Sequence, residues 1–144
     1  MDMNPLSLQE TLGFVFSRAD AMQGFWNLYI VVVTALLGFL GSSQLAWRTH
    51  KIPAVLTIGF LLFAASNFWA LDSARRQREG LIAHAETQLP PNSDAELRLV
   101  LDAVAPPSAP LLQRFHTALD LAVLAAIWMI PYVRRASNSR ATGP

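Results

Sequence analysis

The sequence has no cysteine among its 144 residues. Disulfide bonds, thiolate nucleophiles and cysteine-ligated metal or iron–sulfur centres are therefore excluded. The sequence also has no Walker-type, dinucleotide-binding, nucleophile-elbow or H-E-x-x-H pattern, the short motifs that would position a phosphate, a cofactor or a catalytic zinc. These absences predict a protein that is not an enzyme and that holds no metal and no cofactor.

Charged residues are scarce as well. They make up 15% of the chain, against about 25% in an ordinary soluble domain, while hydrophobic residues make up 53%. A soluble helical protein needs charges along the outer face of each helix, so this composition disfavours a soluble fold. The formal net charge is only +1. Because no broad basic field is present to release counterions from phosphates, we expect no nucleic-acid partner.

Three long apolar runs stand out, over residues 25–45, 52–71 and 115–133. Each has about 20 residues, which at 1.5 Å per residue matches a hydrocarbon core of about 30 Å. The first run begins too late, and without a preceding basic region, to be a cleavable signal. The tryptophans lie near the ends of the runs, where indole rings settle at the headgroup level: Trp26, Trp47, Trp69 and Trp128. The sequence predicts a multi-pass membrane protein with three transmembrane helices.

The segments between the runs also have helical patterns. Ser7 and Glu10 fit a capping box that begins an amphipathic helix, and Ser93 and Glu96 fit a second one. Apolar residues recur at helical spacing over 7–24, 72–88 and 94–104. We expect residues 1–135 to form one all-α membrane-embedded helical bundle, whose amphipathic extensions build a small extramembrane cap on one face. Residues 136–144 are predicted to be a flexible tail.

The basic residues give a direction for insertion. One face of the predicted bundle carries five basic residues and no acid: Arg48, Lys51, Arg134, Arg135 and Arg140. The cap face carries six arginines diluted by nine acids. The denser unopposed positive charge favours the cytoplasmic side, so the sequence predicts that the amino terminus is outside and the carboxyl terminus inside.

Asp120 is the sharpest candidate for a functional residue, because it lies within the third run. An intramembrane carboxylate points to a functional site by default. His116, Asn27 and Asn67 are expected at a similar depth, near the cap. Interhelical hydrogen bonding is the favoured interpretation, and a proton, ion or polar-ligand site or exposure to interfacial water are the alternatives. The opposite leaflet offers few polar groups, which argues against a path through the membrane.

Two further residue sets suggest contacts with other molecules. Small residues recur every four positions on two helices, and such faces let helix backbones approach closely: Thr34, Gly38 and Ser42, and Ala118, Ala122 and Ala126. They predict self-association or binding to another membrane protein. Basic residues near the ends of the runs are predicted to contact anionic lipid headgroups: Arg75, Arg76, Arg78, Arg48, Lys51, Arg134 and Arg135.

The sequence therefore predicts a non-catalytic polytopic membrane protein that acts by assembly, as a homo-oligomer or as an accessory subunit of a membrane complex. The alternative is an oligomeric pore for ions or small solutes, or a small transporter, with a polar ring at the junction between membrane and cap. In either case the lipid bilayer is the first partner of the chain.

Overall fold

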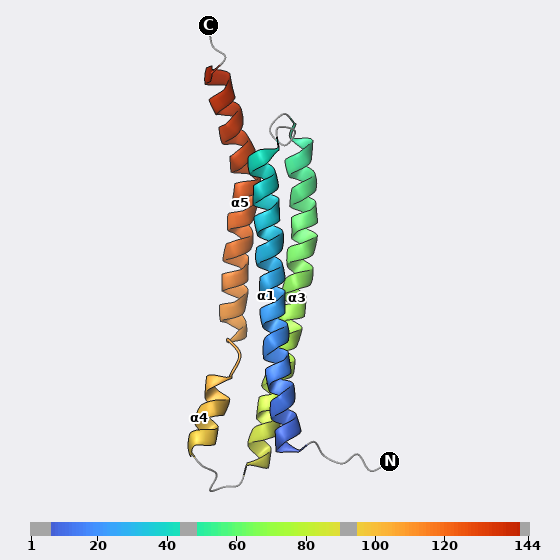
Figure 1. The fold of residues 1–144 in the computed structure, drawn as a ribbon, viewed down its shortest axis with the longest axis vertical. Helices are drawn as coiled ribbons and strands as arrows, with labels where there is room; N and C mark the ends of the chain where they lie inside the picture. Colours follow the sequence, from blue (N-terminus) through green and yellow to red (C-terminus); the bar gives the residue numbers. More distant parts are fainter. Residues whose placement is uncertain (1–6, 44–48, 90–94, 142–144) are drawn as a thin grey trace, which may run out of the picture. The chain divides into compact units, whose positions relative to one another are not determined.

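The computed structural model describes residues 7–43, 49–89 and 95–141 of the chain. Helices account for 92% of these residues and no strand occurs among them. The all-α prediction is confirmed. The elements in chain order are α1 (Leu8–Ser42), α3 (Lys51–Gln88), α4 (Ala95–Ala103) and α5 (Ala109–Ala141), and they are coloured along the sequence in Figure 1.

Three of the helices, α1, α3 and α5, are long and apolar enough to cross a membrane. The predicted runs at 25–45, 52–71 and 115–133 fall within them. The amphipathic segment 7–24 and the first run belong to one continuous helix of 35 residues. The second run and the segment 72–88 likewise form one helix of 38 residues. At 1.5 Å per residue both are longer than 50 Å, well beyond a hydrocarbon core of about 30 Å.

Residue contacts divide the chain into two compact units. Unit 1 comprises Met1–Phe25 and Trp69–Leu112, and unit 2 comprises Trp26–Phe68 and Gln113–Pro144. The chain passes from one unit to the other within α1, within α3 and near the start of α5, without a break in any of these helices.

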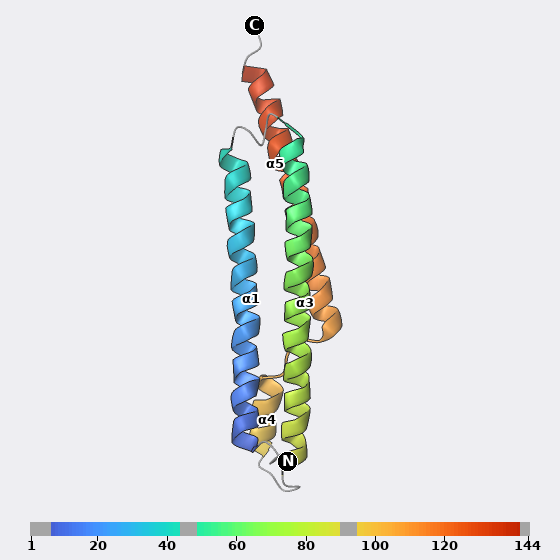
Figure 2. The ribbon, with the colours of Figure 1, turned by 90° about the vertical axis from the view of Figure 1, so that its right-hand side faces the viewer.

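In unit 2, parts of α1, α3 and α5 lie side by side (Figures 1 and 2). Each helix contributes two fully buried side chains to a shared core: Tyr29 and Leu40 from α1, Phe60 and Ala64 from α3, and Val123 and Ile127 from α5. The two residues are four positions apart on α3 and also on α5, a spacing that puts them on a single helix face. This unit contains most of the predicted site residues.

In unit 1, the core is built from the remaining parts of α1 and α3 together with α4. Val15 of α1, Leu71 of α3 and Leu101 of α4 are each at most 2% exposed. The predicted capping box at the start of α1 is confirmed. The Glu10 backbone nitrogen lies 3.3 Å from Ser7 Oγ, and the Ser7 backbone nitrogen donates to Glu10 Oε2 at 2.9 Å. The second predicted box, at Ser93, lies outside the described residues.

The carboxyl-terminal part of the chain differs from the sequence expectation. Residues 136–141, predicted as part of a flexible tail, continue α5 as helix, and residues 142–144 lie outside the described residues. Pro131 lies within α5 and is buried. Its ring nitrogen cannot donate to the carbonyl of Ile127, one turn earlier, so the helix loses one hydrogen bond there.

Candidate functional site

A chain of hydrogen bonds through Asp120 joins α1 to α5 in unit 2. The Tyr29 hydroxyl on α1 donates to Asp120 Oδ1 on α5 at 2.8 Å. His116 Nδ1, one turn before Asp120, lies 2.9 Å from Asp120 Oδ2. The two oxygens of the Asp120 carboxyl group thus each have a partner of their own, one on α1 and one on α5. The structure thus brings together two of the four residues predicted as a polar cluster, Asp120 and His116, and adds Tyr29.

Aromatic rings from α1 and α3 surround His116 of α5, which is only 2% exposed. Its ring centroid lies 5.2 Å from that of Tyr29 on α1, 5.8 Å from that of Trp26 on α1 and 5.3 Å from that of Phe68 on α3. These contacts remove the imidazole from bulk solvent. His116 is therefore the point at which α1, α3 and α5 meet.

Two polar groups in this part of the core have no hydrogen-bond partner. They are the Nε2 nitrogen of His116 and the side-chain amide of Asn67, through both Oδ1 and Nδ2. Asn67 is 4% exposed. It follows Phe60 and Ala64 on the buried face of α3 and precedes Phe68, whose ring contacts His116. A buried polar group without a partner costs about 1 to 3 kcal/mol, so these atoms are candidates to bind a water molecule or another small polar species.

Asn27 is placed differently from the other members of the predicted cluster. It is exposed on α1, whereas the α1 side chain that reaches Asp120 is Tyr29, two residues later. Sequence reasoning missed Tyr29 because tyrosine was treated as an apolar member of the run. A hydroxyl near the start of the first run, at the expected depth of Asp120, was the signal that could have identified it.

The small residues predicted to pack helices together lie outside the helix contacts of unit 2. Thr34, Gly38 and Ser42 are exposed on α1. A Cβ built on Gly38 would meet no atom within 4 Å. On α5, Ala118 and Ala122 are exposed and Ala126 is half-buried. A groove of about 370 Å³ between α1 and α5 is lined by Thr34, Ala122 and Ala126 among larger apolar residues. Most of these small residues are therefore exposed, and three of them line a groove rather than a close helix contact.

The predicted lipid-binding arginines of α3 lie in unit 1. Arg75 is 6% exposed and forms ion pairs with Asp72, at 2.9 Å, and with Glu79. Arg76 is exposed and pairs with Asp72 at 2.7 Å. Hydrogen bonds from Arg75 and then Arg76 hold the pKa of the Asp72 carboxyl below its usual value. Arg78 is half-buried, and burial lowers its pKa. Arg75 is thus engaged with acids of its own helix.

The other predicted lipid-binding residues lie at the start of α3 and near the end of α5. Lys51 and Arg134 are exposed, and Arg135 is half-buried. The Nη1 nitrogen of Arg135 lies 3.0 Å from both ring nitrogens of His50. Arg48 lies outside the described residues. These basic residues form a basic cluster, and they differ from the arginines of α3 in unit 1 in their sequence surroundings. The two stretches of sequence that contain them, 38–71 and 121–144, have no acidic residue.

Within the described residues, no group of three or more His, Asp or Glu side chains is arranged to hold a metal ion. A comparison with protein-family models, with curated proteins and with solved structures finds no match to this chain. The functional argument consequently rests on the geometry of the helices themselves.

Proposed function

We propose that this chain is a non-catalytic, multi-pass membrane protein that works by assembly, as a homo-oligomer or as an accessory subunit. Large apolar side chains on the outer faces of α1, α3 and α5 support a lipid environment, because a monomer in water rarely exposes so continuous an apolar surface. They include Leu28, Ile30, Val31 and Phe39 on α1, Val55, Ile58, Leu61 and Leu62 on α3, and Leu121 and Met129 on α5, all more than 40% exposed.

The observation that carries the assembly proposal is the open face of α1 at Thr34, Gly38 and Ser42. Between helices in lipid, burial of apolar surface gives no driving force, so association depends on close packing and on interhelical hydrogen bonds. Small residues permit that close packing. Because a Cβ at Gly38 would meet no neighbouring segment within 4 Å, this position of the face is open and is available to another helix.

Unit 1 supports a second contact with a partner. We place it outside the bilayer, as the cap, because its helices carry most of the acids of the chain and include the amphipathic segments. Phe14 and Phe16 on α1 are 45% and 50% exposed, and Leu99 on α4 is 67% exposed. In water these side chains are best covered by another protein surface or by the membrane surface. The basic cluster at the start of α3 and near the end of α5 favours an outside amino terminus and an inside carboxyl terminus.

A second candidate function is an oligomeric pore or small transporter. The unpartnered Nε2 of His116 and the unpartnered amide of Asn67 favour it, because both lie buried in helices that could cross a membrane. Against it, the Asp120 carboxylate is already bonded to Tyr29 and His116. In the assembly proposal the bond from Tyr29 joins α1 to α5, the interhelical role favoured from the sequence.

Reconstitution in liposomes tests the assembly proposal. Because the chain has no cysteine, one introduced at Ser137 can carry a fluorophore for counting subunits by single-molecule photobleaching. We expect wild type to be oligomeric and Gly38→Leu to be largely monomeric. Gly59→Leu is the matched control, because Gly59 is also exposed in a helix with no atom within 4 Å of its Cβ position. Monomeric wild type, or equal dissociation by both variants, would contradict the proposal.

The same liposomes test the pore candidate when loaded with a pH-sensitive dye. Proton or ion flux that disappears in Asp120→Asn, while the oligomer persists, would replace the assembly proposal with the pore. Absence of flux in an oligomeric wild type would leave assembly as the function. Gly59→Leu again controls for the effect of an altered helix surface.

A further inference from the structure

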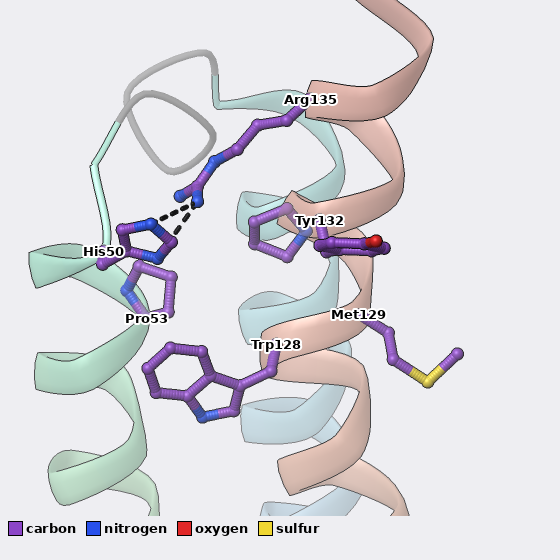
Figure 3. Close-up of a pocket in the computed structure, with 7 residues that line it drawn as sticks. His50, Pro53, Trp128, Met129, Tyr132 and Arg135 are labelled. Carbon is purple, nitrogen blue, oxygen red and sulfur yellow. Dashed lines mark hydrogen bonds between the residues drawn. The ribbon is translucent and has the colours of Figure 1, made fainter.

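A pocket of about 300 Å³ lies in unit 2 between the start of α3 and the later part of α5. Its wall is apolar and includes Pro53, Trp128, Met129 and Tyr132. His50 and Arg135 supply its polar groups. Figure 3 shows Arg135 and Trp128 extending from α5 toward α3, with Pro53 between the levels of these two side chains.

Two hydrogen-bonded bridges from α5 to α3 frame this pocket. The Trp128 indole nitrogen donates to Thr57 Oγ1 at 3.2 Å. Arg135 donates through Nη1 to the ring of His50, 3.0 Å from each ring nitrogen (Figure 3). On α5 the two bridging residues are seven positions apart, which corresponds to about 10 Å along the helix axis; their partners are Thr57 of α3 and His50, the residue just before α3. The indole and the guanidinium are therefore held in place before any ligand arrives.

The charge around the pocket is of one sign. The sequence has no Asp or Glu in residues 38–71 or in residues 121–144, which include every residue that lines the pocket. Exposed Lys51 and Arg134 lie beside His50 and Arg135 in the sequence. Arg135 thus donates to a histidine, a group that can itself become cationic. A phosphate oxygen would accept hydrogen bonds from both groups and would bring the negative charge that this region lacks.

We propose that this pocket binds one anionic phospholipid, with its phosphate at Arg135 and His50 and its glycerol and upper acyl carbons against Trp128 and Tyr132. The inference rests on the membrane embedding in the proposed function and adds a specific lipid to it. A cationic rim above an apolar wall complements an amphiphile better than it complements a free phosphate ion. Trp128 and Tyr132, 45% and 72% exposed, are the residue types that settle at the headgroup level.

The test measures lipid binding to the delipidated full chain in neutral detergent by native mass spectrometry. The probes are palmitoyl-oleoyl phosphatidylglycerol and the matching zwitterionic phosphatidylcholine. We expect one tightly bound phosphatidylglycerol, and at least about a five-fold loss of its affinity in Arg135→Gln, since one basic residue near an anionic headgroup contributes about that factor. Arg114→Gln is the matched control, because Arg114 is an exposed arginine of the same helix, far from the pocket in sequence.

Several outcomes would overturn the proposal. Equal binding of the two lipids, or equal losses in Arg135→Gln and Arg114→Gln, would show that no charge-selective pocket exists. Displacement of the lipid by millimolar inorganic phosphate, with no effect of Trp128→Ala on the lipid affinity, would identify the ligand as a soluble anion. If circular dichroism shows that Arg135→Gln has lost helix, His50→Gln replaces it, with the same loss expected.

An alkaline wash of the liposomes separates this proposal from the function on which it rests. A chain that stays in the membrane and remains oligomeric, yet does not distinguish the two lipids, contradicts the lipid site alone. A chain that alkali removes from the liposomes contradicts both the lipid site and the membrane function.

Discussion

The hydrogen bond from Tyr29 to Asp120 gives the most direct test of the arrangement in unit 2. Tyr29→Phe removes one oxygen atom and retains the ring, which lies 6.3 Å from Phe60 and 6.0 Å from Phe63 between ring centroids. Tyr29 is 3% exposed, so its hydroxyl has little access to water as a substitute partner. The variant therefore reports on the hydrogen bond and very little on packing.

The expected loss of stability depends on the group that accepts the hydrogen bond of Tyr29, the side chain of Asp120. A hydrogen bond to a charged group is worth about 1.5 to 3 kcal/mol, whereas interhelical bonds in membranes average about 0.6 kcal/mol and reach about 1.7. The Asp120 side chain is 22% exposed and keeps its bond to His116, which places the expected loss toward the lower range. We predict that Tyr29→Phe lowers the free energy of unfolding by about 1 to 1.5 kcal/mol.

Reversible unfolding in mixed micelles, followed by helical circular dichroism during titration with dodecyl sulfate, measures this loss. The chain offers a matched control, because Tyr132 is its second tyrosine and is 72% exposed. Tyr132→Phe is expected to change the free energy of unfolding by less than about 0.5 kcal/mol, as surface substitutions do. A double-mutant cycle with Asp120→Leu should give a coupling of about 1 kcal/mol.

Two results would refute the reasoning. Equal losses in Tyr29→Phe and Tyr132→Phe would mean that the hydroxyl of Tyr29 has no special partner. A full loss in Tyr29→Phe that persists unchanged in the Asp120→Leu background would mean that its partner is a group other than Asp120.

The remaining predictions concern unit 1. Since Arg75 and Arg76 hold the pKa of Asp72 below its usual value, that carboxylate stabilises the fold at any pH above the ordinary value of about 3.9, and the contribution is lost as the pH falls through the lowered pKa. Asp72→Asn should therefore flatten the acid limb of a stability profile between about pH 5 and pH 2, and an unchanged limb would exclude Asp72 as its cause. Ser7→Ala removes the cap that bonds to Glu10, at a cost of about 1 kcal/mol. Amide hydrogen exchange should become faster in the first turn of α1 alone, and equal acceleration at the start of α5 would contradict this assignment.

The helices themselves could be predicted because their signals are local. An apolar run of about 20 residues reads as a helix able to cross a membrane wherever its neighbours lie, and the bonds between Ser7 and Glu10 join residues three positions apart. The continuity of α1 and α3 was also expected, since no proline or turn interrupts 7–42 or 54–88. The helical conformation of the end of α5 was not expected. Ser, Asn and Arg in the tail have too little periodicity to predict helix, yet residues 136–141 continue it.

The partners of the polar side chains could not be predicted from spacing alone. Successive residues of a helix turn by about 100°, so a small rotation of α1 decides whether Asn27 or Tyr29 faces Asp120. The structure selects Tyr29 and leaves Asn27 exposed. Arg75 illustrates the same limit, because a position beside a predicted span suggested lipid contact while the fold buries the side chain between Asp72 and Glu79.

The sequence by itself determined that the chain is all-helical, that three helices are long and apolar enough to cross a membrane, and that cysteine chemistry is excluded. These properties depend on composition and on interactions within a few residues. Only the tertiary structure decided that His116 of α5 lies among rings from α1 and α3, that the position of Gly38 stays open, and that Arg135 meets His50 beside an apolar wall. The reason is that these contacts join residues far apart in the chain, and their existence depends on the rotation and register of each helix in the bundle.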